Sequence, residues 1–225
     1  LSTCPVYGAQ EGLLYESSST VPLSVYAETK LEAESYLADK NAIIFRLGTL
    51  FGVGDRFARI RLDLVVNVLT VKARQLSRVK VYGGDQYRPL LHVRDAARAI
   101  AENLTTDHRG IFNLSTENVR IIDLAERIGD RIPGTLIERV GTTYEDTRNY
   151  RVSAEKAETV LGFTPQFSVD RGIEEILVLA DSGRLKDVDN PRYSNKGFLS
   201  LHRTHLEPGY ELQGTDLERG RRIAA

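Results

Sequence analysis

The stretch Ala42-Ile43-Ile44-Phe45-Arg46-Leu47 is a short, nearly continuous apolar run. Such a run is typical of a strand that is covered on both faces in a parallel sheet. The spacing of residues 25–39 predicts a helix before it, with Ser24 at the N-cap position. Residues 1–8 predict an earlier strand that ends in a turn at Gly8. Strand, helix and strand in this order form a βαβ unit, so the sequence predicts the α/β class.

The remaining pattern continues the alternation of helices and strands. We expect a polar loop over residues 9–25, helices over 57–76, 94–104, 121–128, 153–161 and 168–182, and strands over 79–82, 90–93, 111–114 and 136–140. After residue 184 the periodicity fades, and the segment is expected to be a loop, arm or tail.

Composition excludes several classes of function. The 225 residues are 41% hydrophobic and 27% charged, with a net charge of -1, so neither a nucleic-acid nor a membrane-surface partner is indicated. No apolar run is long enough to cross a bilayer. The single cysteine, Cys4, excludes an internal disulfide and favours a cytoplasmic location. His202 and His205 stand apart from any Cys or carboxylate cluster, so no metal site is expected.

The beginning of the chain is unusual. The sequence contains no Met and opens inside a predicted core strand. We therefore expect a fragment of a longer protein, with N-terminal processing of a complete protein as the alternative.

Two Tyr-x-x-x-Lys pairs, Tyr26/Lys30 and Tyr36/Lys40, lie on the predicted helix. Residues four apart share a helix face, and an ammonium group close to a phenol favours the phenolate, which can act as a base towards an alcohol. Tyr26 stands at the start of the helix beside a loop, where a site can open, whereas Tyr36 stands at the far end. We therefore predict that Tyr26 and Lys30 form the functional pair.

Several segments resemble the extended short-chain dehydrogenase/reductase family of NAD-dependent nucleotide-sugar epimerases and dehydratases. They are S-T-C-P-V-Y-G at 2–8, P-L-S-V-Y-A-E-T-K at 22–30, R-L-G-T-L-F-G at 46–52, V-Y-G-G-D-Q-Y-R-P-L-L-H-V-R-D at 81–95, F-N-L at 112–114 and L-G-F-T-P at 161–165. The resemblance implies NAD or NADP as cofactor, a nucleotide-sugar substrate and a possible homodimer. No G-x-x-G-x-x-G motif is present, so the N-terminal Rossmann half of the family is expected to be missing.

The resemblance also implies an architecture. It is the C-terminal part of a doubly wound, Rossmann-like parallel sheet with a smaller α/β substrate-binding lobe. Residues 1–56 would end the dinucleotide-binding domain and carry the catalytic helix. Residues 57–183 would mainly form the substrate lobe, with strands that return to the sheet, and residues 184–225 a C-terminal arm or tail.

Roles for individual residues follow from the same resemblance. Thr3 would polarise the sugar oxygen, Tyr26 would be the catalytic acid and base, and Lys30 would contact the nicotinamide ribose; Tyr26 and Lys30 would thus also bind the cofactor. The substrate-binding residues would be Thr49, Val81, Tyr82, Arg88 and Arg148, with Arg88 and Arg148 on the diphosphate, where a planar guanidinium suits bidentate contact.

Departures from the family pattern narrow the activity. Thr49 stands where many members carry Asn, and Pro89 replaces an Asp after Arg88. Cys4 and Pro5 stand where the 4,6-dehydratases carry an Asp-Glu pair. We therefore expect an epimerase resembling UDP-glucose 4-epimerase. The alternatives are a reductase or dehydratase of the same family, and a truncated module that binds a nucleotide sugar or a protein without catalysis.

Overall fold

The predicted βαβ unit is present in the computed structural model, which describes residues 1–55, 58–141 and 149–202. Strand β3 (Ile43–Leu47) lies between β1 (Ser2–Thr3) and β7 (Gly110–Leu114) in a three-stranded parallel sheet. Helix α1 (Val25–Leu37) connects β1 to β3. The α/β class predicted from the sequence is confirmed.

Three further sheets extend the molecule away from this one. Strand β4 (Thr49–Phe51) pairs parallel with β6 (Tyr87–His92), which pairs antiparallel with β8 (Glu117–Arg120). The two remaining sheets are parallel pairs, β5 (Arg78–Tyr82) with β9 (Leu136–Val140) and β2 (Ala9–Leu14) with β10 (Asn149–Val152).

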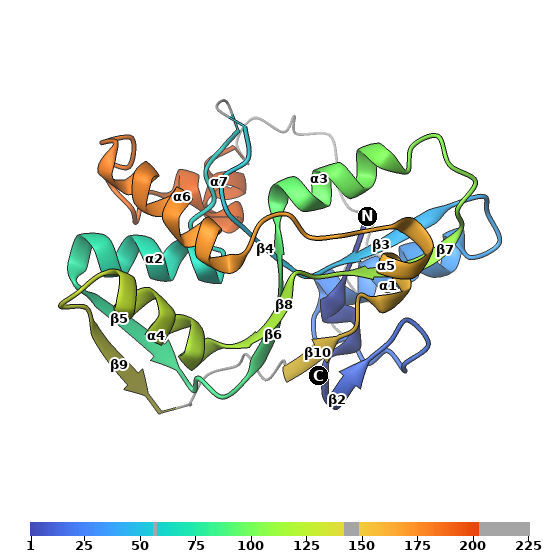
Figure 1. Cartoon of the computed structure of the whole chain (residues 1–225), viewed down its shortest axis with the longest axis horizontal. Coiled ribbons are helices and arrows are strands. Elements are labelled where there is room, and N and C mark those ends of the chain that lie inside the picture. The colour runs from blue at the N-terminus through green and yellow to red at the C-terminus, as the bar shows by residue number, and fades with distance from the viewer. Residues whose placement is uncertain (56–57, 142–148, 203–225) are drawn as a thin grey trace, which may run out of the picture.

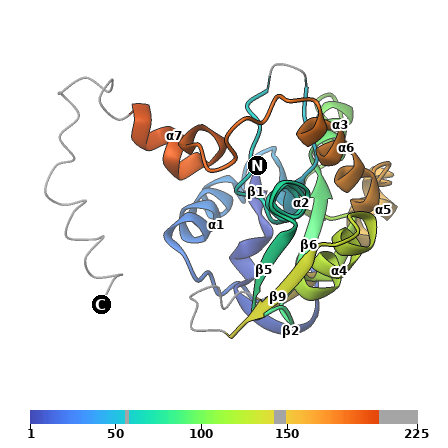
Figure 2. The same ribbon diagram turned by 90° about the vertical axis from the view of Figure 1, so that its left-hand side faces the viewer.

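The helices cover these sheets from two sides. They are α2 (Val65–Leu76), α3 (Val93–Glu102), α4 (Ile121–Arg131), α5 (Glu155–Leu161), α6 (Val169–Asp181) and α7 (Asn195–His202), with short 3-10 turns η1 (Cys4–Tyr7) and η2 (Pro191–Tyr193). Figure 1 shows one half of the molecule built around β1, β3 and β7, and another built around β5, β9, α2 and α4. The strands β4, β6 and β8 run between the halves. In Figure 2, α1 and α7 lie on one side of the molecule and α3 to α6 on the other.

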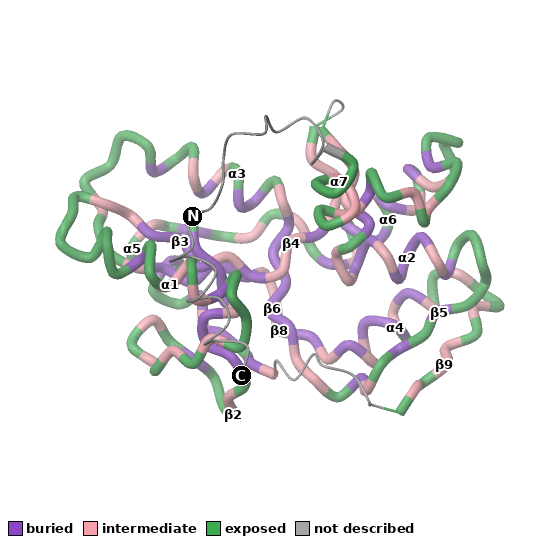
Figure 3. The backbone as a smooth tube through the Cα atoms, turned by 180° about the vertical axis from the view of Figure 1, so that it is seen from behind, coloured by how far each residue is buried: buried purple, intermediate pink, exposed green. Residues whose placement is uncertain are grey.

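Burial follows this division into two halves. One apolar cluster joins α2, α4 and α6 to β5, β6 and β8, and a second joins α3 and α5 to β3 and β7. Figure 3 shows the buried residues concentrated on the strands that connect the halves. Helix α1 contributes little to these clusters, and most of its surface is exposed.

Three expectations about secondary structure are wrong. Residues 9–14 form β2 rather than loop, because they pair with β10, a partner far away in the sequence. Residues 58–64 are not helical, and the helix begins only at Val65, because this segment bonds elsewhere: Leu62 N–H donates to Tyr193 O at 2.8 Å. Residues 195–202 form a helix, α7, where a loop or arm was expected.

Candidate active site

The first turn of α1 carries the predicted catalytic tyrosine. Ser24 is extended, and its Oγ accepts a hydrogen bond from Ala27 N at 3.2 Å, which starts the helix one residue before Tyr26. The Tyr26 ring is 56% exposed. One turn further on, Lys30 Nζ lies 5.9 Å from the centroid of that ring. The Tyr26 side chain is therefore open to solvent and lies beside an ammonium group.

Lys30 also links the helix to the strand that carries Thr3. Its Nζ donates to Leu1 O at 3.3 Å, two residues before Thr3. Thr3 is buried at the end of β1, where η1 begins at Cys4. The structure thus gathers Tyr26 and Lys30, and places Lys30 against the N-terminal end of the Thr3 strand.

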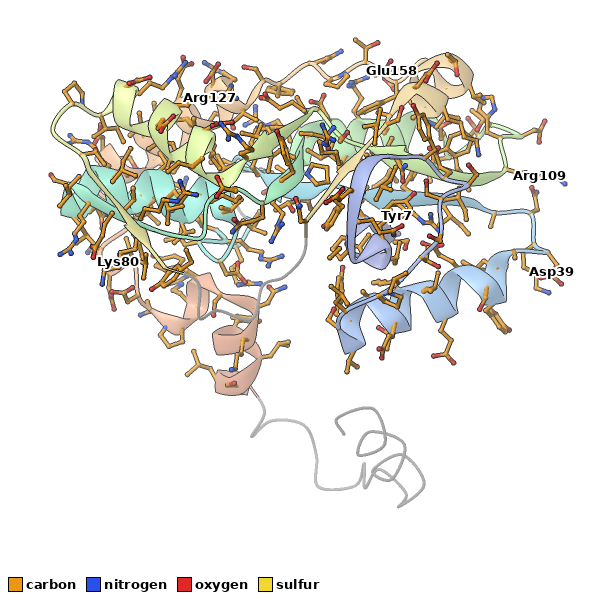
Figure 4. All side chains as sticks on the ribbon, turned by 90° about the horizontal axis from the view of Figure 1, so that it is seen from below. Tyr7, Asp39, Lys80, Arg109, Arg127 and Glu158 are labelled. Atoms are coloured by element: carbon orange, nitrogen blue, oxygen red, sulfur yellow. The ribbon has the colours of Figure 1, made fainter. Side chains whose placement is uncertain are left out.

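The second tyrosine–lysine pair has a different environment. Tyr36 is 75% exposed near the end of α1, and Lys40, beyond the helix, pairs with the carboxylate of Asp39 at 3.0 Å. Figure 4 shows Asp39 at the outer end of the molecule, far along α1 from its first turn.

The residues predicted to bind substrate lie on the strands that lead into the second half. Thr49 is half-buried on β4, and Tyr82 is exposed at the end of β5. Val81 is 1% exposed and packs in the core, because alternate side chains of β5 point inwards. Any contact of Val81 with a ligand would therefore come from its backbone.

Arg88 is buried on β6. Its Nη1 donates to Tyr87 O at 2.8 Å, and its guanidinium carbon lies 6.0 Å from the centroid of the Tyr150 ring. Arg148, predicted to be the second diphosphate ligand, lies outside the described residues.

A buried polar network between α1 and the sheet was not predicted. Arg46 and Glu34 are both 4% exposed and form a bidentate ion pair, with Nη2 to Oε2 at 2.6 Å and Nε to Oε1 at 3.0 Å. Ser2 Oγ donates to Glu34 Oε1, and Arg46 Nη1 donates to Tyr7 Oη at 2.9 Å. Two signals were available: Arg46 interrupts an apolar run, and Glu34 follows Lys30 by one helical turn.

Electrostatics fixes the protonation of this network. Burial opposes the charge of Arg46, but its hydrogen bonds to Glu34 and Tyr7 outweigh burial and hold the pKa of the guanidinium above its usual value. Burial raises the pKa of Tyr7 to about 12, against the opposing effect of Arg46. Tyr7 therefore stays a neutral phenol, and its hydroxyl can donate to Asn113 Oδ1 at 2.8 Å. Figure 4 shows Tyr7 inside the molecule, on the side of the sheet that α1 covers.

His92 and Asp95 have structural roles. His92 is fully buried, its Nδ1 accepts from Arg94 N at 3.2 Å, and its Nε2 lies 3.1 Å from Glu175 Oε2. Asp95 accepts from the backbone N–H groups of residues 166 and 167. In the part of the chain that the structure describes, no three His, Cys, Asp or Glu side chains are grouped to hold a metal ion. No helix among the described residues has the length and apolar character of a membrane span.

Comparison with protein families gives a match over the first 115 residues of the chain. The model of the NAD dependent epimerase/dehydratase family matches residues 1–115, which include Thr3, Tyr26, Lys30, Thr49 and Arg88. The chain belongs to the NAD-dependent epimerase/dehydratase family. The resemblance inferred from the motifs is thereby confirmed.

Individual family members are distant relatives. A UDP-glucose 4-epimerase of Halalkalibacterium halodurans is 28% identical over 194 residues, which are 74% of this chain and 57% of the relative. The chain therefore spans little more than half the length of that relative. The structure of MoeE5 in complex with UDP-glucose and NAD is 27% identical, with a TM-score of 0.66, over 80% of this chain and 64% of that one.

The fold extends to more distant members. The structure of ADP-L-glycero-D-manno-heptose-6-epimerase from Helicobacter pylori has a TM-score of 0.69 at 17% identity, over 80% of this chain and 59% of that one. At this identity the likeness concerns the fold alone, and it agrees with the Rossmann-like parallel sheet predicted from the sequence.

Proposed function

We propose that this chain carries the catalytic helix and the substrate lobe of an enzyme that epimerises a nucleotide-activated sugar by transient hydride transfer. The observation that carries the proposal is the exposed Tyr26 ring with the Lys30 ammonium 5.9 Å from its centroid. The likeness to a UDP-glucose 4-epimerase supports a nucleotide diphosphate sugar as the substrate class.

In this proposal Tyr26 and Lys30 carry out the proton transfer, and Thr3 orients the sugar oxygen. Tyr26 accepts the proton of a sugar hydroxyl, and the Lys30 ammonium stabilises the phenolate that accepts it. Thr3 donates a hydrogen bond to the same oxygen and holds it in line with Tyr26. A bound nicotinamide would supply a reversible hydride acceptor for the carbon that bears this oxygen. After the keto sugar has rotated in the site and the hydride has returned to its other face, Tyr26 returns the proton to the oxygen.

The fit to NAD or NADP is confined to one end of the cofactor. Tyr26 and Lys30 offer a hydroxyl and an ammonium group to the nicotinamide ribose. The 225 residues contain no G-x-x-G-x-x-G loop, whose backbone would hold the pyrophosphate. Binding of the whole cofactor is therefore not attributed to these residues.

The substrate would lie between α1 and the strands of the second half. Arg88 and Arg148 are the proposed diphosphate ligands, with Thr49 and Tyr82 beside the sugar and the base. Epimerisation is favoured over dehydration because Cys4 is a buried thiol and Pro5 an imino acid, so neither supplies a carboxyl group.

A homodimer formed through α1 is part of the proposal. The helix exposes Val25, Tyr36 and Leu37, and exposed apolar side chains on one helix suit a partner helix. Sedimentation velocity of the purified protein tests this, and a single monomeric species over a wide concentration range would contradict it.

Replacement of Tyr26 by Phe tests the catalytic assignment. With UDP-glucose and NAD as the probe pair, turnover of the complete enzyme that contains this chain should fall by about 10²–10⁴-fold, because the proton acceptor is lost. Stability should change by less than about 0.5 kcal/mol, because the ring is largely exposed. Product analysis by NMR distinguishes an epimer formed with the cofactor regenerated from a reduced or dehydrated sugar.

Tyr36→Phe is the matched control and should leave turnover unchanged. Equal loss of activity in the two variants, or full activity in Tyr26→Phe, would refute the choice of pair.

A further inference from the structure

Few side chains of helix α1 are buried against the described residues of this chain. Within α1, whose thirteen residues are all described, Ala27 and Glu34 are the buried side chains. An open surface hollow of about 610 Å³ runs along the helix beside Arg46 and Ile111. Its lining residues are Pro22, Glu28, Leu31, Glu32, Glu34, Ser35, Ala38, Arg46 and Ile111. Leu31 packs against the apolar cluster that contains Val6 and Tyr7, so the apolar contact between α1 and the rest of the described chain is confined to a small area.

The Glu34–Arg46 ion pair supplies the missing attachment. Three hydrogen bonds between 2.6 and 3.2 Å join the two side chains, so Glu34 on α1 has one orientation relative to Arg46 on β3. Removing two charges from water costs several kcal/mol each, so a buried pair is a weak source of stability compared with apolar side chains of the same volume. A bidentate pair fixes the relative orientation of the two elements that it joins more strictly than apolar contacts do.

The same ion pair forms hydrogen bonds to residues before and after Thr3 in the sequence. Ser2, directly before Thr3, donates to Glu34, and Tyr7, at the end of the following turn, accepts from Arg46 at 2.9 Å. Tyr7 also contacts the Arg46 guanidinium with its ring, at 4.9 Å from the centroid. The helix and the residues around Thr3 are thus attached to one guanidinium–carboxylate unit.

The geometry of α1 carries this attachment to the reacting groups. Glu34 lies four residues after Lys30 and eight after Tyr26, rotated from them by about 40° and 80° at 100° per residue. Lys30 makes a second attachment to the same strand through Leu1 O. A shift of the helix along the strand would change the distance between the Tyr26 and Thr3 oxygens, and misplacement by about 1 Å can cost 10²-fold in rate.

We propose that Glu34 and Arg46 are positioning residues that set the catalytic helix against the Thr3 strand. This inference rests on the proposed function, because it assigns the network a role in the alignment of Thr3, Tyr26 and Lys30. Neither side chain touches substrate in this role, and both act through the groups that they align.

The test compares three variants of the complete enzyme that contains this chain, with UDP-glucose and NAD. Glu34→Gln keeps the shape and removes the charge, and the double variant Glu34→Leu with Arg46→Met replaces the pair by apolar side chains of similar size. Asp95→Asn is the matched control, because it also changes a buried carboxylate to an amide, but on α3, at a distance from α1 in the chain and on the other side of the sheet.

Glu34→Gln and the double variant should lower kcat at least tenfold and change KM less than threefold. The kinetic isotope effect with sugar deuterated at the reacting carbon should rise, because hydride transfer becomes the slow step. Asp95→Asn should keep kcat within twofold, even if it lowers the thermal midpoint as much as Glu34→Gln does.

Two different results would overturn two different claims. If the complete enzyme is active and the double variant retains its kcat, or if kcat falls equally in Asp95→Asn, the positioning role is refuted and the proposed function stands. If the complete enzyme binds NAD and the nucleotide sugar but converts no sugar, the proposed function is refuted, and the positioning role with it.

Discussion

Replacement of Arg46 alone should lower the free energy of unfolding more than the loss of any exposed ion pair. Arg46→Met leaves the Glu34 carboxylate, which is 4% exposed, with Ser2 Oγ as its remaining donor in the part of the chain that the structure describes. Breaking a buried pair on one side costs about 3–5 kcal/mol, because the surviving charge loses its partner without regaining water. Glu34→Leu should cost a similar amount by leaving the guanidinium with Tyr7. The double variant should cost less than either single variant, because no unpaired charge remains.

Urea unfolding followed by far-UV circular dichroism measures these free energies, and the cycle of two single variants and one double variant isolates the coupling. Arg74→Met is the control, because Arg74 pairs with Asp181 at 2.7 Å while both side chains are about half exposed. That variant should cost about 0–1 kcal/mol. The reasoning fails if Arg46→Met costs no more than Arg74→Met, or if the cost of the double variant equals the sum of the two single ones.

Two further changes, a lower pH that acts through His92 and a substitution at Gly8, should each lower the free energy of unfolding. Burial lowers the pKa of His92 below its ordinary 6.5, so as pH falls through about 6.5 the unfolded chain takes up a proton that the folded chain refuses. The unfolding free energy should therefore decrease between about pH 7.5 and pH 5, and His92→Asn should flatten that decrease in pH-dependent urea titrations. Gly8→Ala should cost more than about 2 kcal/mol, because φ is 73° and an added Cβ would lie 1.9 Å from Val21 O. Gly12→Ala, with φ 84° and nothing within 4 Å, should cost about 1–2 kcal/mol, and equal thermal midpoints for the two variants would contradict the steric argument.

Elements with a strong local pattern were predictable. The helix that begins at Val25 has its N-cap at Ser24, and the apolar run 43–47 is a strand with partners on both sides, as its composition indicates. Both features depend on neighbours in the sequence or on simple burial. For the same reason the Tyr26–Lys30 contact could be expected from the helical repeat alone.

Features that depend on distant partners could not be predicted. Strand β2 is mostly exposed and has no regular alternation of apolar side chains, and it is a strand because β10 lies beside it. Residues 58–64 bond to the segment around Tyr193, so a helical spacing of apolar residues did not become a helix there. Val81 was expected to line a pocket because of its motif, but the alternation of β5 turns its side chain into the core.

The join between the two halves has a consequence for how substrate can enter. Strand β3 continues into β4 through Gly48 alone, whose N–H donates to Leu114 O at 2.9 Å, and Thr116 N–H donates to Leu90 O at 2.6 Å where β7 continues into β8. A Cβ at Gly48 would lie 3.0 Å from Pro89 O, so the backbones are in close contact at this crossing. A hinge there would break these bonds at once. We therefore expect the two halves to keep one fixed orientation. The proposed sugar substrate would then enter through rearrangement of loops and side chains, and no binding energy would be used to close one half upon the other.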